Sequence, residues 1–278
     1  MILLNKNGLP TPVLMAIQQS IDGYDRGDCE FTTTELIKSA YHCRLKKENY
    51  ATLEVEADEN LASMAGTALH AAIECAARKI DGAVCEQRYY AVIDGHKIGG
   101  KIDYMCGSAL YDWKDTKVWE SVFEPDHYKW TAQMNINRYI LKQNKINTTK
   151  MIVWARYKDW MPSKAKNPDG YPGHHHEQVL IHAWNDDKTL AYIRERLADH
   201  LSEKPEPCAP WYTGEKPTLY AIMREGRKSA LKLCAYETEA RGRMGEYGGT
   251  YIETRPGGKF MCDGYCDCRH ICPENRGA

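Results

Sequence analysis

The chain has 278 residues, of which 43% are hydrophobic and 27% are charged, with 37 Lys and Arg against 38 Asp and Glu. This composition excludes a disordered or collagen-like chain and suits one large domain or two small ones. The net charge of −1 excludes nucleic-acid binding through bulk positive charge, but not through a local basic groove. Because no apolar run approaches the ~18 residues that span a bilayer, and the first residues lack a secretory pattern, we expect a cytoplasmic protein without membrane contact.

Helical periodicity is typical of the first part of the chain. A short helix is expected within residues 8–30, and a second one begins at a threonine cap at 32–35 and continues to about Lys47. A stronger helix is expected over 60–78, where apolar residues recur every three or four positions. The pattern then changes to alternation, which predicts three strands joined as a meander, over residues 87–93, 97–105 and 109–114.

The remaining elements indicate an α/β fold. They are, in order, a helix over 127–145, strands over 150–157 and 178–184, a helix over 186–203 and a basic helix over 224–243. A Pro-rich stretch at 204–210 marks the expected boundary between two domains, 1–203 and 204–278. This order of helices and strands predicts a mixed sheet that packs against helices.

Three charged residues in the predicted meander carry the first chemical signal. Strand alternation places Asp112 and Lys114 on one face, and a hairpin can bring Asp103 beside Asp112. Two converging carboxylates repel each other, and a hard divalent cation relieves that repulsion. Lys114 would then lie where it can orient or deprotonate a water molecule. From this segment alone, a solvent-facing ion pair on an edge strand explains the residues slightly better than a metal site does.

Two predicted helices add polar side chains that are ordinary when taken singly. His70 and Glu74 are four residues apart and share a face of the alanine-rich helix. Gln133 and Asn137 share one side of the helix over 127–145. A lone histidine or glutamine on a helix is more often structural than functional, so the significance of these residues depends on their order in the chain.

Taken in order, the set resembles the PD-(D/E)XK nuclease superfamily, and most closely its RecB-like exonuclease branch, which includes CRISPR-associated and phage-encoded enzymes. The motifs that carry the resemblance are Gly66-x-x-x-His70, Gly-x-x-Asp103, Asp112-x-Lys114, and Gln133 with Tyr139 nearby. They cover about residues 30–145. The resemblance implies a restriction-endonuclease-like core with a mixed central sheet flanked by helices, in a bacterial or phage-infected cell.

The resemblance also implies roles for single residues. The catalytic Mg²⁺ or Mn²⁺ would be bound by His70, Asp103, Asp112 and the Trp113 carbonyl. Lys114 would be the catalytic lysine, its pKa lowered below ~10.4 by the cation, and Gln133 would contact DNA or organise the site. Thr33, Thr34 and Arg44 would lie where the family's N-terminal helix approaches the substrate. The chain departs from the pattern at Asn137, where the family commonly has Tyr, which leaves open the role of Tyr139.

Four of the 11 cysteines form a terminal cluster: Cys262, Cys266, Cys268 and Cys272. Four thiolates so close in sequence can bind one Zn²⁺. The nuclease branch implies a [4Fe–4S] cluster instead, held by three C-terminal cysteines and one distant cysteine. Cys262, Cys266 and Cys272 match that trio, and Cys43 or Cys208 would complete it. Either metal would make the segment a Cys-rich metal-binding extension of the core.

The sequence therefore predicts a metal-dependent DNA exonuclease that acts on single strands or duplex ends, with a recombination or CRISPR-adaptation protein as a compatible partner. The main alternative is a non-catalytic DNA-binding or recombination-partner module with a structural metal cluster. A third alternative, a metal-sensing or redox protein, leaves the upstream residues unexplained. Basic and aromatic residues at 154–166 fit a single-strand channel, or equally a solvated loop.

Overall fold

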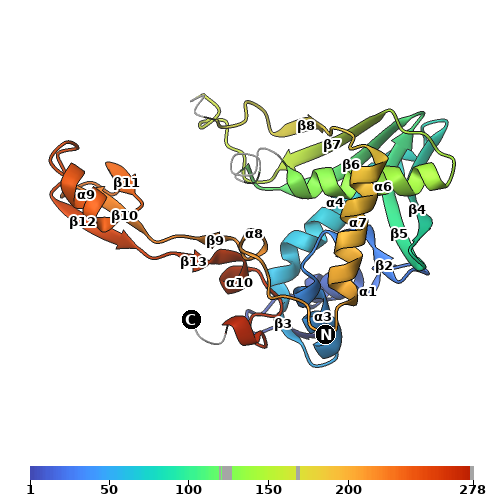
Figure 1. Cartoon of the computed structure of the whole chain (residues 1–278), viewed down its shortest axis with the longest axis horizontal. Helices are drawn as coiled ribbons and strands as arrows, with labels where there is room; N and C mark the ends of the chain where they lie inside the picture. Colours follow the sequence, from blue (N-terminus) through green and yellow to red (C-terminus); the bar gives the residue numbers. More distant parts are fainter. Residues whose placement is uncertain (119, 121–126, 167–169, 276–278) are drawn as a thin grey trace. The chain divides into compact units, whose positions relative to one another are not determined.

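The computed structural model describes residues 1–118, 120, 127–166 and 170–275, which form two units. The first unit comprises Met1–Cys43 and Glu54–Pro205, and the second comprises Arg44–Leu53 and the chain from Glu206. Figure 1 colours both along the sequence. Within the described part of the chain, no helix combines the length and the hydropathy needed to cross a membrane.

A six-stranded mixed sheet forms the centre of the first unit (Figure 1). Its strands are β2 (Phe31–Thr32), β4 (Ala83–Ile93), β5 (His96–Cys106), β6 (Ala109–Thr116), β7 (Lys150–Tyr157) and β8 (His176–Leu180). The meander β4–β5–β6 is antiparallel and β6–β7 is parallel, so the predicted meander and mixed sheet are confirmed. The last strand is shorter than predicted, since β8 ends at Leu180.

Two strands, β2 and β6, pair with different parts of the same edge of β5, and the stretch around Asp103 lies between the two pairings. Strand β6 pairs with β5 only from Tyr104 to Cys106, and β2 pairs with the same strand in parallel at Ile98 and Gly99. The residues of β5 between these two pairings, including Asp103, have no ladder partner on that edge among the described strands. The carboxylate of Asp103 therefore lies where β5 and β6 diverge.

Helices flank this sheet. In the first unit they are α1 (Thr11–Asp22), α2 (Thr33–Leu36), the start of α3 (Ala40–Asn49), the 3-10 turn η1 (Ala57–Asn60), α4 (Leu61–Ala77), α6 (Tyr128–Gln143) and α7 (Asp186–Leu201). A short parallel pair, β1 (Ile2–Leu4) and β3 (Glu54–Glu56), is also present and was not predicted. Helices α1, α4, α6 and α7 confirm the predicted helical segments within a few residues.

The single helix predicted from Thr32 to Lys47 is wrong, because the chain breaks between α2 and α3. Thr32 caps α2 as predicted, in a reciprocal capping box with Glu35. The break follows from Arg196 of α7, whose guanidinium donates to the carbonyl oxygens of Leu36 at 2.8 Å and Lys38 at 2.6 Å. These contacts satisfy carbonyl groups that a helix end leaves without partners.

The core lies between the sheet and α6. Trp130, Met134 and Leu141 of α6 pack on Ile102 and Val153, and all five are buried. A second cluster joins α6 to α2, α7 and the sheet through buried apolar residues: Leu36, Ala91, Ile93, Ile98, Ile136, Ile140, Ile193 and Leu197. Burial of these side chains fixes α6 against the strands that carry the predicted site.

The second unit contains small sheets and short helices. Its three-stranded sheet has the order β11 (Lys232–Cys234), β10 (Leu219–Met223), β12 (Tyr251–Arg255), and β9 (Glu215–Lys216) pairs with β13 (Gly258–Lys259). Its helices are α8 (Pro210–Thr213), α9 (Glu237–Arg243), α10 (Phe260–Gly264) and the 3-10 turn η2 (Pro273–Asn275). The unit has its own apolar cluster around Ile222, Cys234 and Ala240.

The basic helix predicted over 224–243 is also wrong. The segment forms a loop after β10, then β11, and only its last seven residues are helical, in α9. Gly226, with a φ of 76°, turns the chain within that loop. In α9, Arg241 and Arg243 pair with Glu237 and Glu239, so much of the basic charge is neutralised locally.

Candidate active site

Two adjacent strands change face at the same point, and each places a carboxylate there. In β4, an even-numbered residue, Val84, packs against the core near the start of the strand, whereas odd-numbered residues, Ala91 and Ile93, are in the core near its end. The face of β4 that meets the core therefore changes along the strand. In β5, Ile102 and Met105 show the same reversal. The residues at the reversal are Glu86, which has a φ of 53°, and Asp103. A non-glycine residue in this left-handed region is uncommon and is typical of functional sites.

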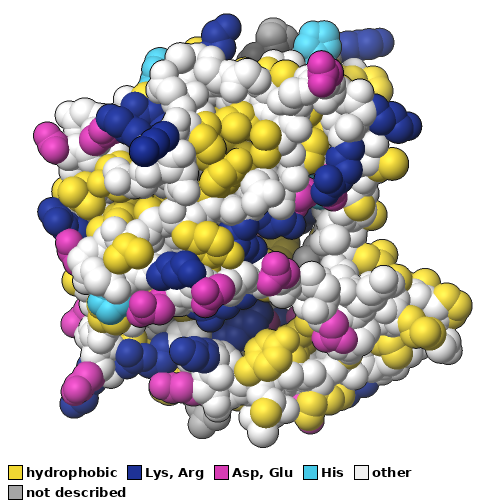
Figure 2. Space-filling model, turned by 90° about the vertical axis from the view of Figure 1, so that its right-hand side faces the viewer, with side chains coloured by type: hydrophobic (Ala, Val, Ile, Leu, Met, Phe, Trp, Pro, Cys, Tyr) yellow, Lys and Arg dark blue, Asp and Glu magenta, His cyan; other side chains and the backbone are white. Residues whose placement is uncertain are grey.

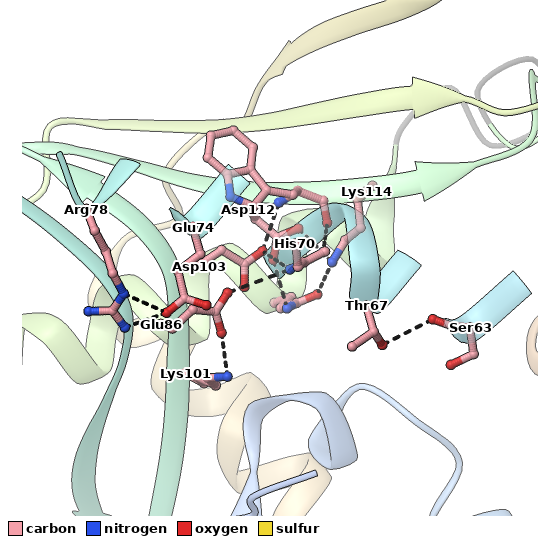
Figure 3. A network of polar contacts seen from close by, with 12 residues as sticks. Ser63, Thr67, His70, Glu74, Arg78, Glu86, Lys101, Asp103, Asp112 and Lys114 are labelled. Atoms are coloured by element: carbon pink, nitrogen blue, oxygen red, sulfur yellow. Dashed lines mark hydrogen bonds and ion pairs between the residues drawn. The ribbon is translucent and has the colours of Figure 1, made fainter. Parts of the chain in front are cut away.

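Helix α4 brings an imidazole to these two carboxylates (Figure 3). His70 Nδ1 lies 3.8 Å from Glu86 Oε1 and 3.7 Å from Asp103 Oδ2. His70 Nε2 lies 3.0 Å from the Trp113 carbonyl oxygen. Because a carbonyl oxygen can only accept, Nε2 carries a proton and Nδ1 faces the carboxylates. The ligand atoms of His70, Glu86 and Asp103 all lie within 4.8 Å of one another.

Strand β6 ties this group to a lysine and a glutamine. The backbone N–H of Trp113 donates to Asp103 Oδ2 at 2.8 Å. On the α6 side of the strand, Lys114 Nζ lies 2.6 Å from Asp112 Oδ2 and donates to Gln133 Oε1 at 3.1 Å. Gln133 Nε2 donates to Asp112 Oδ1 at 3.0 Å. The three side chains therefore form a closed polar triangle beside the carboxylates.

Gly100 allows α6 to lie close enough to supply Gln133. A Cβ atom at Gly100 would lie 2.6 Å from Asn137 Oδ1 and 3.1 Å from Ile140 Cδ1. Asn137 accepts a hydrogen bond of 2.9 Å from the hydroxyl of Thr33, which is buried. Asn137 and Thr33 therefore hold α6 and α2 together beneath the site.

The charges of the site are concentrated and mostly buried. Burial, and then the charge of Asp112, raise the pKa of Asp103 to about 7. The pKa of His70 is raised, chiefly by the Glu86 carboxylate. Burial raises the pKa of Glu86, but His70 and Lys101 outweigh burial, and the net pKa is lowered. Burial and the charge of Asp112 therefore disfavour the anionic form of Asp103.

The pKa of Lys114 differs from the sequence-based expectation. Burial lowers it, but the charges of Asp112 and Asp103 outweigh burial, and the net pKa is raised. The expectation from the sequence is that a bound cation lowers the pKa of Lys114. The neighbouring carboxylates have the opposite effect, because their negative charge favours the protonated amine. In the protein alone, Lys114 is therefore a charged partner of Asp112 and not a neutral base.

The structure brings most of the predicted site residues together. His70, Asp103 and the Trp113 backbone meet at one point, and Lys114, Asp112 and Gln133 meet beside it. Asp112 is not part of the three-residue group; its carboxylate faces Lys114 and Gln133, although its charge acts on Asp103. Glu74 pairs with Arg78 instead of facing the site.

The resemblance also singled out Tyr139, Thr34 and Arg44. Tyr139 packs against the second core cluster, and Thr34 is exposed at the start of α2. Arg44 belongs to the second unit.

Sequence reasoning missed Glu86. The residue lies just before the strand predicted over 87–93, and its approach to His70 depends on the left-handed turn of the backbone at that position. Neither alternation nor spacing encodes that turn. The only available signal was a glutamate preceding a predicted strand in a chain that already offered two converging aspartates.

The predicted metal-binding cysteines divide between the units. Cys43 belongs to the first unit, whereas Cys208, Cys262, Cys266 and Cys272 belong to the second. None of the 11 cysteines, all within the described residues, forms a disulfide. Burial, and then the neighbouring thiols of Cys266, Cys208 and Cys272, raise the pKa of Cys262, so each of these three thiols acts electrostatically on Cys262.

Cys268 has different surroundings. It is buried, and its pKa is raised chiefly by a hydrogen bond with Cys266 and by burial. Its neighbour Asp267 forms an ion pair with Lys46 within the second unit.

No protein-family model and no curated protein matches the sequence. The fold is similar to the crystal structure of a protein named SSO0001, with a TM-score of 0.54 at 14% identity; the match covers 74% of this chain and 93% of that chain. This similarity shows the fold alone. A structure of a candidate exonuclease from Eubacterium rectale gives a TM-score of 0.29 at 13% identity, over 71% of this chain and 82% of that chain, and so low a score supports no argument.

The surface agrees with the balanced charge of the chain. On the face drawn in Figure 2, Lys and Arg side chains are interspersed with Asp and Glu, with hydrophobic side chains between them. Among the described residues drawn on this face, no extended area carries a single charge. Recognition of a polyanion on it would therefore depend on local contacts.

Proposed function

We propose that the protein is a metal-dependent nuclease that hydrolyses phosphodiester bonds in DNA. The observation that carries the proposal is the convergence of the ligand atoms of His70, Glu86 and Asp103 within 4.8 Å of one another, beside Lys114. The order of the motifs along the chain, which resembles RecB-like exonucleases, supports the finer assignment to an exonuclease acting on single strands or duplex ends.

The donor set suits a divalent cation. Glu86 Oε1 and Asp112 Oδ2 are buried carboxylate oxygens without an aligned hydrogen-bond donor among the described residues, although Lys114 lies close to Asp112. A buried carboxylate oxygen without an aligned donor is costly even where its acid has an ion-pair partner, as Glu86 has in Lys101 and Asp112 has in Lys114. A cation removes that cost. Two carboxylates with one imidazole fit Mg²⁺ or Mn²⁺, and the imidazole favours Mn²⁺. We propose His70, Glu86 and Asp103 as ligands, with Asp112 and the Trp113 carbonyl as the further ligands implied by the resemblance.

The chemistry follows from the charges around a phosphodiester. A bound divalent cation supplies Lewis acidity, which acidifies water and offsets negative charge on the phosphate. The ammonium of Lys114 is positioned by Asp112 and Gln133, so it can orient a water molecule and stabilise the negative charge that develops on phosphate oxygens. Gln133 holds the Lys114 and Asp112 side chains in place and offers its amide to the substrate.

The test compares cleavage by matched variants. End-labelled single-stranded and duplex DNA is incubated with Mg²⁺ or Mn²⁺ and with the parent, Asp112→Ala, Lys114→Ala or the control Asp28→Ala, whose side chain is 95% exposed. We expect both site variants to lose cleavage by at least ~100-fold while the control cleaves at the parent rate. Cleavage by either site variant at the parent rate would contradict the proposal.

The same experiment addresses the non-catalytic alternative. A parent protein that binds DNA but leaves it intact with either cation would support a DNA-binding or recombination-partner module. The burial of Asp103 next to the charge of Asp112 favours the enzyme, because a binding module has no physical need for buried acids that repel each other.

We further propose that Cys208, Cys262, Cys266 and Cys272 bind a [4Fe–4S] cluster. The support is that all four belong to one unit and that the Cys266, Cys208 and Cys272 thiols act on Cys262 and help burial to raise its pKa. Thiolates that repel each other in this way favour a bound metal. Zn²⁺ at the terminal cysteines is the alternative. Visible absorption with iron and zinc quantification distinguishes the two. Cys208→Ser should remove the metal and Cys43→Ser should retain it; the opposite result would assign the distant ligand to Cys43.

A further inference from the structure

The outer face of the sheet, opposite α6, carries four aromatic side chains in mutual contact. Tyr104, Tyr111, Trp113 and Trp154 are partly exposed and form what we call the aromatic face. Tyr104 lies 5.4 Å from Tyr111 and 5.7 Å from Trp113 between ring centroids, the latter pair stacked, and Trp113 meets Trp154 edge-on at 6.1 Å. Figure 1 shows the neighbouring strands β5, β6 and β7 that present them.

Strand alternation separates the aromatic face from the core. In β7, Met151, Val153 and Ala155 point into the core, so Trp154 points to the other face. Trp113 pairs with Trp154 across the parallel ladder and therefore shares its face. Apolar rings of this size are usually buried, and a partly exposed cluster of them is typical of a binding surface.

The aromatic face adjoins the proposed active site through β6. Tyr111 and Trp113 flank Asp112 in sequence, at about 3.3 Å of strand per residue. The backbone of Trp113 contacts two site residues, because its N–H donates to Asp103 and its carbonyl accepts from His70. The ring of Trp113 is thus fixed relative to the point where a phosphate would be cleaved.

The charge on this face suits a nucleic acid. Among the outward-pointing residues of β6, β7 and β8, the sole acid is Asp115, which is 3% exposed and pairs with Arg156 at 2.8 Å. The Arg156 side chain is 34% exposed, and His176 lies opposite it on β8. Solvent therefore meets flat rings and a cation without an exposed carboxylate from these strands.

We propose that the aromatic face binds unpaired nucleotides by stacking, next to the scissile phosphate. The proposal rests on the nuclease function and specifies its substrate as a single strand or a frayed end. Bases stack on aromatic rings regardless of sequence, because every base has a π face, and Arg156 pairs with phosphate. A duplex keeps its bases stacked on one another and cannot use the rings.

The experiment measures affinity for an oligothymidylate of about 12 nucleotides, a length within the range of single-strand sites. Fluorescence anisotropy is recorded in EDTA, so that binding is separated from cleavage. The variants are Tyr111→Ala and Trp154→Ala, with Trp154→Leu, which keeps apolar volume but has no ring. The control is Tyr236→Ala, whose side chain is 71% exposed. Thermal unfolding checks that each variant is folded.

We expect Tyr111→Ala, Trp154→Ala and Trp154→Leu each to weaken oligothymidylate binding about tenfold, or ~1.4 kcal/mol, with the control unchanged. Affinity for a blunt duplex should be unchanged in all of them. Unchanged oligothymidylate affinity in folded Trp154→Leu and Tyr111→Ala would overturn the proposal and assign the face to a protein partner. Equal losses for duplex and single strand would also overturn it. A parent that binds through these rings but never cleaves would contradict only the nuclease function.

Discussion

Asp103→Asn separates the stability of the native state from the proposed activity. Asn is nearly isosteric with Asp and still offers an oxygen to the Trp113 N–H, which donates to Asp103 Oδ2 at 2.8 Å. The substitution removes one of two carboxylates that repel each other in a buried site. We therefore expect the variant to be more stable than the parent without metal, and inactive.

The magnitude follows from the raised pKa of Asp103. An increase from its ordinary value of 3.8 to about 7 makes the ionised native state less stable by about 4 kcal/mol at pH 8, at about 1.36 kcal/mol per pKa unit. The raised pKa already includes the attraction of Lys114 and of the Trp113 N–H. The value is an upper limit, because Asn brings into the buried site an NH2 group that needs hydrogen-bond acceptors. We expect a gain of ~1–3 kcal/mol in the free energy of unfolding.

The sign of the pH dependence is fixed by the direction of the shift. Below pH ~4 the carboxyl group is protonated in both native and unfolded states, so the substitution should have little effect there. Between pH ~4 and 7 the unfolded state releases this proton first, and the advantage of the variant should increase.

Urea unfolding of parent and Asp103→Asn in EDTA at pH 4 and pH 8 measures this gain. An excess of Mn²⁺ should then stabilise the parent, by about 2.7 kcal/mol at 100 times the Kd, and leave the variant nearly unchanged. A variant less stable than the parent at pH 8 in EDTA would refute the reasoning.

Three further predictions concern the scaffold. Gly100→Ala should lower the free energy of unfolding by ~1–3 kcal/mol in urea titrations, because the added Cβ would approach Asn137 Oδ1 to 2.6 Å; an unchanged midpoint would show that α6 shifts freely. Arg196→Ala should lower the free energy of unfolding by ~2–4 kcal/mol, because it removes charged hydrogen bonds to the carbonyl groups of Leu36 and Lys38. The control Arg194→Ala, on the exposed face of the same helix, should lower it by less than ~1 kcal/mol. Equal losses in the two variants would contradict this prediction. Burial lowers the pKa of His200, so below pH ~6.5 the unfolded state takes up a proton before the native state does, and the melting temperature should fall as the pH decreases. His200→Gln should make the melting temperature less dependent on pH. Identical slopes of melting temperature against pH in the two proteins would exclude His200 as the source.

The sequence predicted the parts of the fold that periodicity encodes. The meander and α6 follow from regular burial of one face, and their apolar residues form the core as expected. The helix α4 forms where the helical period of its apolar residues predicts it, but Ala77 is its only buried residue. The break between α2 and α3 was missed because Arg196, which contacts the Leu36 carbonyl, is 160 residues away in sequence. A local signal was present in Ser39, which precedes α3 and whose hydroxyl accepts from the His42 N–H at 3.4 Å. The basic segment over 224–243 does not form the predicted long helix, and the arginines of its short helix α9 pair with nearby glutamates.

The site was predictable where residue order carries the information. The order of His70, Asp103, Asp112, Lys114 and Gln133 was enough to expect their convergence, and the structure brings them into two adjoining groups. Glu86 was not predictable, because its position follows from a backbone turn shared by two paired strands. The aromatic face was also not predictable from the sequence, because Tyr104 lies on the same face of the sheet as Tyr111 and Trp113 only after β5 changes face.

The most direct test of the account is the Mn²⁺ concentration that gives half-maximal cleavage of end-labelled single-stranded DNA, compared between the parent and Glu86→Gln. Glu86 is the residue that structure alone adds to the site, and its unpartnered Oε1 faces His70. The account predicts cleavage that depends on Mn²⁺ and a requirement that rises at least ~10-fold in the variant. Cleavage by the parent that persists in EDTA, or an identical requirement in both proteins, would contradict it.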